Sequence, residues 1–216
     1  MVPFKRARSP EQILLRKDKI VKCALHIYDR KGYSEVNFCA LSKLTELSRP
    51  AIYAYFKNTD DILLYGLGQD VDDLNNYLDN KFRSCRSLDN EGFTKILHEG
   101  FISHPRLLKM ISLNYAVMEN GASCEALIAY KAKIMKTIAL IIRFVDSFFV
   151  PLKKEQRTDF IFMLFSYTVS AYVLTNPSKK QLEAILKCDS NFMFPSCEHL
   201  CYEGLKSVVS TLKMRM

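Results

Sequence analysis

The sequence has little glycine or proline and lacks the short motifs of common enzyme classes. Of its 216 residues, 7 are Gly and 7 are Pro, and most of these lie between segments with a helical apolar period. This scarcity favours an all-helical fold. Gly-x-Ser-x-Gly, a glycine-rich phosphate loop and His-Glu-x-x-His are absent from the sequence, so we expect neither an enzyme nor a cofactor.

The seven cysteines include no Cys-x-x-Cys pair. Cys197 and Cys201 stand one helical turn apart with His199 between them, but a zinc site needs convergent ligands, commonly in paired sets. We therefore predict no metal site and interpret the cysteines as reduced thiols. A redox or metal role for Cys197 and Cys201 stays open.

The sequence also lacks a long apolar segment of the kind that crosses a membrane. No apolar core follows the basic N-terminus, so we expect no secretory signal. The longest uncharged apolar run, Phe160 to Leu174, is shorter than the roughly 18–20 residues of a bilayer span and contains Ser, Thr and Tyr. We expect a cytoplasmic protein without a membrane partner, in which this run is a buried or subunit-interface helix.

Positive charge is concentrated at the N-terminal end. The net charge is +8, and residues 1–59 contain 12 Lys and Arg but 5 Asp and Glu, so the first quarter carries nearly all of the imbalance. Such a concentration is typical of proteins that contact nucleic acid or an anionic surface. A solubility tail explains a basic arm at residues 1–9 but not the basic residues within the helices that follow.

Capping signals divide this basic region into three helices. A long helix is expected from Ser9 to Gly32, and Asn37 can cap a short second helix. After a three-residue turn, Ser48 can cap a third helix near residues 48–56. Two short helices joined by a tight turn behind a long helix are typical of a helix-turn-helix unit.

The third helix combines a proline, a cation and aromatic residues that a simple core helix would not contain. Arg49 can form paired hydrogen bonds with guanine, and Pro50 offers an apolar surface to a thymine methyl group. So small a domain cannot bury both Tyr53 and Tyr55 without leaving hydroxyls unpaired, so we expect them to contact DNA. We assign Phe56 to the core.

The order of these features resembles the N-terminal DNA-binding domain of the tetracycline-repressor (TetR/AcrR) family. The resemblance covers about residues 13–67 and includes the stretch Leu-Ser-Arg-Pro-Ala-Ile-Tyr-Ala-Tyr-Phe-Lys-Asn. It implies an all-α, ligand-responsive repressor that binds a palindromic double-stranded DNA operator as a homodimer. Residues 1–59 would be the DNA-binding domain and residues 60–216 a helical effector-binding and dimerisation domain. The residues that the family pattern places on DNA are Asn37, Ser48, Arg49, Pro50, Ala51, Tyr53, Tyr55 and Lys57.

Two positions depart from the family pattern. Glu46 stands in the turn where the family usually has glycine, which accepts a left-handed backbone more readily, so we expect a strained or altered turn. Thr59 stands where Lys is common, so one phosphate contact is expected to be missing. These departures leave open a second class of protein, a small-molecule-binding or protein-interaction module whose helix-turn-helix is vestigial.

Beyond residue 59 the apolar period predicts helices near 60–83, 89–103, 105–119, 122–149, 154–175, 179–187 and 197–214. The family pattern implies that this part binds a small-molecule effector, which we expect to be apolar or amphipathic. For each residue assigned to the effector, ordinary core packing is the alternative. The expected effector contacts are Phe101, Met110, Tyr115, Met118, Glu119, Phe144, Phe148 and Phe165. The expected dimer contacts, on the helices at 154–175 and 197–214, are Tyr167, Tyr172, Leu205, Val208, Val209 and Leu212.

Overall fold

The computed structural model describes residues 9–214, without the side chains of Tyr115 and Ala116. Within that range the chain is helical, and its strand-like pairing is limited to one isolated bridge between Phe149 and Met214. This confirms the all-α fold predicted from the sequence. Most of the basic arm at residues 1–9 lies outside the described residues.

The chain forms two compact units, here called the N-terminal and C-terminal units. Helices α4 (Thr59–Ser84) and α8 (Cys124–Phe148) contribute residues to both. This division by contacts differs from the functional boundary between residues 59 and 60, which stays a prediction. The N-terminal unit is Met1–Gln69 with Tyr115–Lys131, and the C-terminal unit is Asp70–Asn114 with Ala132–Met216.

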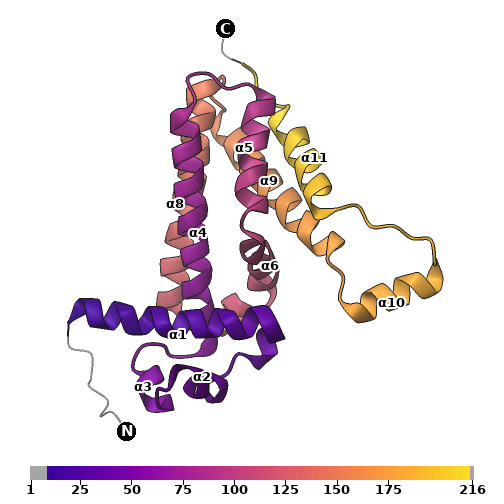
Figure 1. Ribbon diagram of the computed structural model, residues 1–216. Helices are drawn as coiled ribbons and strands as arrows, with labels where there is room; N and C mark the ends of the chain where they lie inside the picture. The colour runs from indigo at the N-terminus through magenta and orange to yellow at the C-terminus, as the bar shows by residue number, and fades with distance from the viewer. Residues whose placement is uncertain (1–8, 215–216) are drawn as a thin grey trace. The chain divides into compact units, whose positions relative to one another are not determined.

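Three helices begin the N-terminal unit, as the capping signals predict: α1 (Pro10–Lys31), α2 (Phe38–Thr45) and α3 (Arg49–Tyr53) (Figure 1). The Ser9 side chain accepts a hydrogen bond from the third residue of α1. Gly32 ends α1 at φ 91° and ψ 176°, a conformation that essentially only glycine adopts. The core beneath these helices is formed by Ile20, Val21, Ala24, Leu41, Leu47, Ile52 and Phe56.

The turn between α2 and α3 contains a left-handed residue that is not glycine. Glu46 has φ 60° and ψ 18°. The hydroxyl of Thr45 donates to the carbonyl of Leu41 at 2.7 Å and accepts from the amide of Leu47 at 3.3 Å. The hydroxyl of Ser42 donates to the Leu47 carbonyl at 2.6 Å. The expected helix-turn-helix turn therefore forms with Glu at its left-handed position, held by side-chain hydroxyls.

One helix predicted from the sequence is interrupted. The segment expected to be helical over 105–119 is α-helical as α6 (Pro105–Leu113), continues as a π-helix over Asn114–Met118 and ends in the short α7 (Glu119–Gly121). A π-turn inserts about one extra residue without changing the apolar character of the segment, so a periodicity argument does not detect it.

The C-terminal unit is a bundle in which α11 (Cys197–Val209) packs on α5 (Asn90–Ile102) and α9 (Lys154–Thr175) (Figure 1). Helix α6 also packs on α5 and α9. Aromatic rings fill part of its core: Phe82 lies between Phe93 and Phe144, with ring centroids 4.8 Å and 4.7 Å away. Between α9 and α11 lies the further helix α10 (Lys179–Cys188).

Helix α9 is apolar on two opposite sides. One side is buried in the unit through residues such as Phe160 and Leu164, whereas Phe162 on the other side is 70% exposed. Among the described residues α9 is the helix that is long and apolar enough to cross a membrane. Of its most apolar 18-residue stretch, 28% is buried inside the protein. Core and interface helices of soluble proteins pass the same test, so this is weak evidence for a span.

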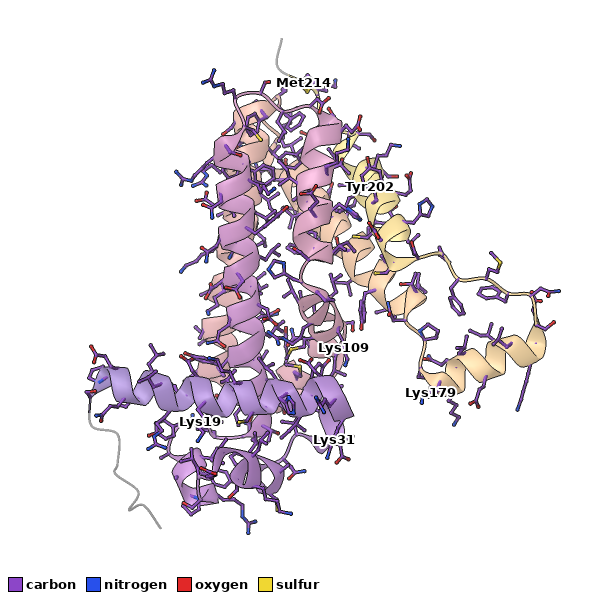
Figure 2. The ribbon with its side chains drawn as sticks, viewed as in Figure 1. Lys19, Lys31, Lys109, Lys179, Tyr202 and Met214 are labelled. Atoms are coloured by element: carbon purple, nitrogen blue, oxygen red, sulfur yellow. The ribbon has the colours of Figure 1, made fainter. Side chains whose placement is uncertain are left out.

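Helix α10 contributes no residue to the core of its own chain. It begins at Lys179, and its start is held by a reciprocal capping box between Ser178 and Gln181. The helix projects from the rest of the C-terminal unit (Figures 1 and 2). Its apolar side chains Leu182 and Leu186 are exposed.

Candidate nucleic-acid interface

Helix α3 has two distinct faces. Ile52 is fully buried and Phe56, just beyond the helix, is buried as well, which confirms that both belong to the core. Arg49 and Pro50 are exposed, and Tyr53 is 55% exposed. The short helix is thus seated on α2 by its inner residues while its outer side chains are available to a ligand.

The residues predicted to flank this surface have defined local roles. The Ser48 hydroxyl caps α3 by accepting from the amide of Ala51 at 3.4 Å. The Asn37 side chain caps α2, accepting from the amide of Ala40 at 3.0 Å and donating to the carbonyl of Glu35 at 3.1 Å. Both are exposed, and Ala51 is half-buried. Their contact with DNA stays a prediction, as does that of the half-buried Tyr55.

Phe38 was not singled out from the sequence, yet its ring stacks on that of Tyr53. The ring centroids are 4.1 Å apart and the planes are inclined by 15°. An apolar residue directly after the Asn37 cap was the available signal, but the contact depends on how α2 and α3 cross. The structure therefore adds Phe38 to the candidate interface.

Lys57 follows α3 and carries an ion pair. Its ammonium lies 2.8 Å from a carboxylate oxygen of Glu125, and both side chains are exposed. The hydrogen bond to Glu125 raises the pKa of Lys57, and the same bond lowers the pKa of Glu125. Lys57 therefore stays charged, as a phosphate contact requires, but its charge is shared with a carboxylate 68 positions along the chain.

Further hydrogen bonds fix the segment after α7 to the start of α4 within the N-terminal unit. The Asn58 side chain donates to the carbonyl of Gly121 at 3.0 Å, and the amide of Ser123 donates to the Asp61 carboxylate at 2.7 Å. A Cβ added at Gly121 would lie 1.9 Å from a carboxylate oxygen of Asp60. A side chain at position 121 would therefore require the Asp60 carboxylate to move, and the segment is held in register with the residue that follows Lys57.

Asp60 accepts a second close contact. The hydroxyl of Tyr33 donates to its carboxylate at 2.6 Å. Burial, followed by this hydrogen bond, raises the pKa of Tyr33 to about 12. Tyr33 and Asp60 thus tie the short 3₁₀ helix after α1 (Tyr33–Glu35) to the first turn of α4.

The residues predicted to contact an effector are distributed over both units. Phe101, Met110 and Phe144 are buried in the C-terminal unit, and Phe148 and Phe165 are half-buried there. Phe144 stacks on Phe148 with ring centroids 6.3 Å apart, and Phe101 meets Phe165 edge-on at 6.5 Å.

The remaining predicted effector contacts belong to the N-terminal unit. Met118 is fully buried, and Glu119 pairs with Lys131 at 2.6 Å. The side chain of Tyr115 lies outside the described residues. The ion pair agrees with the alternative that Glu119 is a paired charge, and an effector contact at any of these positions stays a prediction.

Four of the predicted dimer contacts are buried in their own chain. Leu205, Val208, Val209 and Leu212 are at most 4% exposed because α11 packs on α5 and α9. Side chains this deeply buried offer little surface to a second chain, and a dimer contact at these positions stays a prediction. Tyr172 is half-buried, whereas Tyr167 is 48% exposed.

The close approach of α11 to α9 depends on a glycine. A Cβ added at Gly204 would lie 2.9 Å from the Cβ of Tyr167. The side chain of Tyr167 thus covers Gly204 on one side and reaches solvent on the other.

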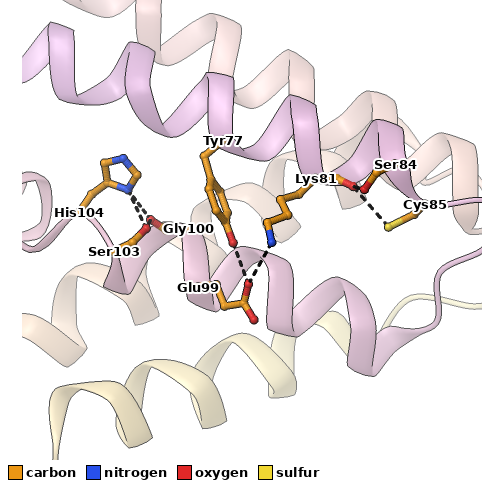
Figure 3. Close-up of polar contacts among 8 residues, drawn as sticks. All are labelled: Tyr77, Lys81, Ser84, Cys85, Glu99, Gly100, Ser103 and His104. Atoms are coloured by element: carbon orange, nitrogen blue, oxygen red, sulfur yellow. Dashed lines mark hydrogen bonds and ion pairs between the residues drawn. The ribbon is translucent and has the colours of Figure 1, made fainter.

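The polar contacts drawn in Figure 3 join neighbouring helices of the C-terminal unit. The hydroxyl of Tyr77 donates to the carboxylate of Glu99 at 2.8 Å, and Lys81 lies 3.9 Å from the same carboxylate. Nδ1 of His104 donates to the carbonyl of Gly100 at 2.7 Å. The contacts of Glu99 tie α4 to α5, and the His104 bond caps the end of α5.

A shallow hollow of about 390 Å³ lies beside Tyr202 on α11. Nε2 of His98 donates to the carbonyl of Glu198 at 3.0 Å, and the His98 ring meets that of Tyr202 edge-on. The hollow is lined by His98, Ser196, Glu198, His199 and Tyr202.

The cysteines form no metal site within residues 9–214. Cys201 is fully buried, and this burial raises the pKa of its thiol to about 12. A thiol that stays protonated is a poor nucleophile and a poor metal ligand. No group of three His, Cys, Asp or Glu side chains in the described part of the chain is arranged to hold a metal ion.

The chain thus combines a helix-turn-helix unit that has an exposed outer face with a larger helical part. This combination is typical of proteins that regulate transcription by binding DNA. A comparison with protein families identifies residues 67–209 as a "Tetracyclin repressor-like, C-terminal domain". The chain belongs to the TetR family of transcriptional regulators. Its sequence matches no curated protein.

Solved structures of several transcriptional regulators share the fold over nearly the whole chain. FadR from Bacillus halodurans, a fatty acid degradation regulator, has a TM-score of 0.60 at 13% identity and covers 97% of this chain and 100% of its own. A TetR/AcrR-family regulator from Thermobifida fusca has a TM-score of 0.59 at 17% identity, covering 90% of this chain and 96% of its own. FadR from Bacillus subtilis, solved with stearoyl-CoA, has a TM-score of 0.55 at 15% identity, covering 89% and 97%. Identities this low indicate a shared fold and not a shared ligand.

Proposed function

We propose that the protein is a ligand-responsive transcriptional repressor that binds a palindromic operator as a homodimer in the cytoplasm. The observation that carries the proposal is the two-faced helix α3, in which Ile52 is buried while Arg49, Pro50 and Tyr53 are exposed. A helix seated in this way can present its outer side chains to the major groove. Lys57 adds a charge for the phosphate backbone.

A second copy of the chain would cover the exposed face of α9. Monomeric soluble proteins rarely expose large contiguous apolar patches. A dimer would also increase sequence selectivity. The five residues of α3 contact few base pairs, and two-fold symmetry doubles the number contacted. Tyr167 keeps its predicted place in this interface. The other exposed apolar residues of α9 are Phe162, Met163, Val173 and Leu174.

The effector would bind among the helices that carry the predicted aromatic residues. The ring pairs of Phe144 with Phe148 and of Phe101 with Phe165 supply apolar walls, which suit an apolar or amphipathic molecule. Bound effector would favour a form whose recognition helices are wrongly spaced for successive grooves. Its effect on DNA binding is limited to its difference in affinity for the two forms.

The experiment that tests the proposal is selection of bound fragments from a random duplex library at two salt concentrations. Wild type and Arg49→Ala are compared, and Arg86→Ala, an exposed arginine of the C-terminal unit, is the matched control. We expect wild type and the control to enrich a palindrome that Arg49→Ala loses, because removing a paired donor to guanine costs roughly 1–3 kcal/mol.

The contrary result would be equal, weak and strongly salt-dependent binding by all three proteins. That pattern would mean that the basic residues contact phosphates without reading bases. The vestigial helix-turn-helix module would then be the better description.

A further inference from the structure

Two aromatic side chains are stacked on the surface that is proposed to meet DNA. Phe38 is the first residue of α2 and Tyr53 is the last residue of α3. Their rings are nearly parallel, inclined by 15°, with centroids 4.1 Å apart. Phe38 is half-buried, whereas Tyr53 is 55% exposed. The stack therefore joins the two helices of the helix-turn-helix at the solvent side.

The stack restrains a side chain that its own helix restrains poorly. Helix α3 has five residues and Tyr53 is the last of them, so little of its own helix lies beside the ring. A ring that is disordered in the free protein loses rotational freedom when DNA binds, and this loss lowers the affinity. Stacking on Phe38 removes most of that freedom in advance.

The position of Phe38 is itself fixed. Asn37 holds the beginning of α2 through its bonds to the amide of Ala40 at 3.0 Å and to the carbonyl of Glu35 at 3.1 Å. The ring that supports Tyr53 is therefore attached to a capped helix end and not to a free loop.

Resting on the proposed DNA-binding function, we propose that Phe38 is a positioning residue for DNA recognition. Phe38 has no group that hydrogen-bonds to DNA. It holds the Tyr53 ring so that the phenolic hydroxyl meets a backbone phosphate or a base edge. Asn37 contributes through Phe38, in addition to any contact of its own.

A double-mutant cycle tests this role. Phe38→Leu, Tyr53→Phe and the double variant are titrated with the palindrome that wild type selects, and binding is followed by fluorescence anisotropy of labelled DNA. Loss of the stack and loss of the hydroxyl should each weaken binding about three- to tenfold. The double variant should be no weaker than the weaker single variant, because Phe38 acts through the Tyr53 hydroxyl. Phe38→Tyr keeps a ring at this position and should bind as wild type does.

The controls separate positioning from folding. Phe192→Leu changes another aromatic pair, Phe192 with Phe194 at 4.9 Å in the C-terminal unit, and should leave DNA affinity unchanged. The slope of log affinity against log salt concentration should be the same for wild type, Phe38→Leu and Tyr53→Phe, since none of them loses a cation. A smaller slope for Phe38→Leu would show that the DNA-binding helices have come apart, which overturns a pure positioning role.

Two further results would overturn the inference while leaving the proposed function intact. One is wild-type affinity in Phe38→Leu, and the other is additive losses in the double variant. If wild type itself selects no sequence, the proposed function fails, and the inference fails with it.

Discussion

At the scale of single residues, Glu46 shows how the helix-turn-helix forms around an unfavourable residue. Its φ of 60° places it in the left-handed region, which costs a residue with a Cβ roughly 1–2 kcal/mol. The turn is retained because the hydroxyls of Thr45 and Ser42 bond to the backbone on either side of it. The departure from the family pattern at this position therefore affects stability and not the course of the chain.

Replacing Glu46 with glycine should relieve this cost. We expect Glu46→Gly to raise the free energy of unfolding by about 0.5–1 kcal/mol, less than the full relief because glycine also gains freedom in the unfolded chain. Urea denaturation of wild type and variant measures the difference. Glu46→Ala removes the same charge but keeps a Cβ, so it should not reproduce the gain. Equal stabilities for the two variants would point to the charge and not to the backbone.

At the scale of elements, the contact between the segment that joins α3 to α4 and the beginning of α8 brings distant parts of the sequence together. Lys57 pairs with Glu125, and the neighbouring Asn58 and Asp61 bond to the segment that precedes α8. If Lys57 contacts a phosphate, Glu125 competes with DNA for its ammonium.

Removing this competitor should strengthen DNA binding. We expect Glu125→Gln to raise affinity about twofold to fivefold at low salt, the range typical of exposed ion pairs, and the gain should shrink as salt rises. Titration of one labelled duplex at several salt concentrations gives both quantities. Glu91→Gln, which breaks the exposed pair with Lys95 on α5, is the matched control. Unchanged or weaker binding by Glu125→Gln would place Lys57 away from the DNA.

The elements also show what the sequence could and could not predict. Helix starts followed from local chemistry, because Ser9, Asn37 and Ser48 each accept a bond from a nearby amide. The π-helical segment over Asn114–Met118 did not follow, since it leaves the apolar period nearly unchanged. The sequence also could not predict which surface buries an apolar residue. Leu205 is buried by its own chain, and no pattern within α11 distinguishes this from burial by a second chain.

At the scale of the whole molecule, we expect the exposed side of α9 to determine whether the chain forms a dimer. We expect Phe162→Asp to convert the dimer to a monomer at micromolar concentration, because a dimer would bury this ring and the variant would bury a charge. Sedimentation equilibrium measures the change. Ile128→Asp on α8, where the side chain is 64% exposed, is the control and should leave the dimer intact. A wild-type chain that sediments as a monomer would contradict this assignment of α9.

Because the exposed face of α9 is apolar, the proposed dimer and the proposed DNA complex should respond in opposite ways to the salt concentration. Contact between apolar side chains persists in concentrated salt and is strengthened by sulfate, whereas contact between lysines or arginines and DNA weakens steeply as salt rises. Nearly all of the net positive charge lies within residues 1–59, away in sequence from the apolar residues of α9. A wash in concentrated sulfate should therefore strip copurifying nucleic acid from the protein and leave its subunits together.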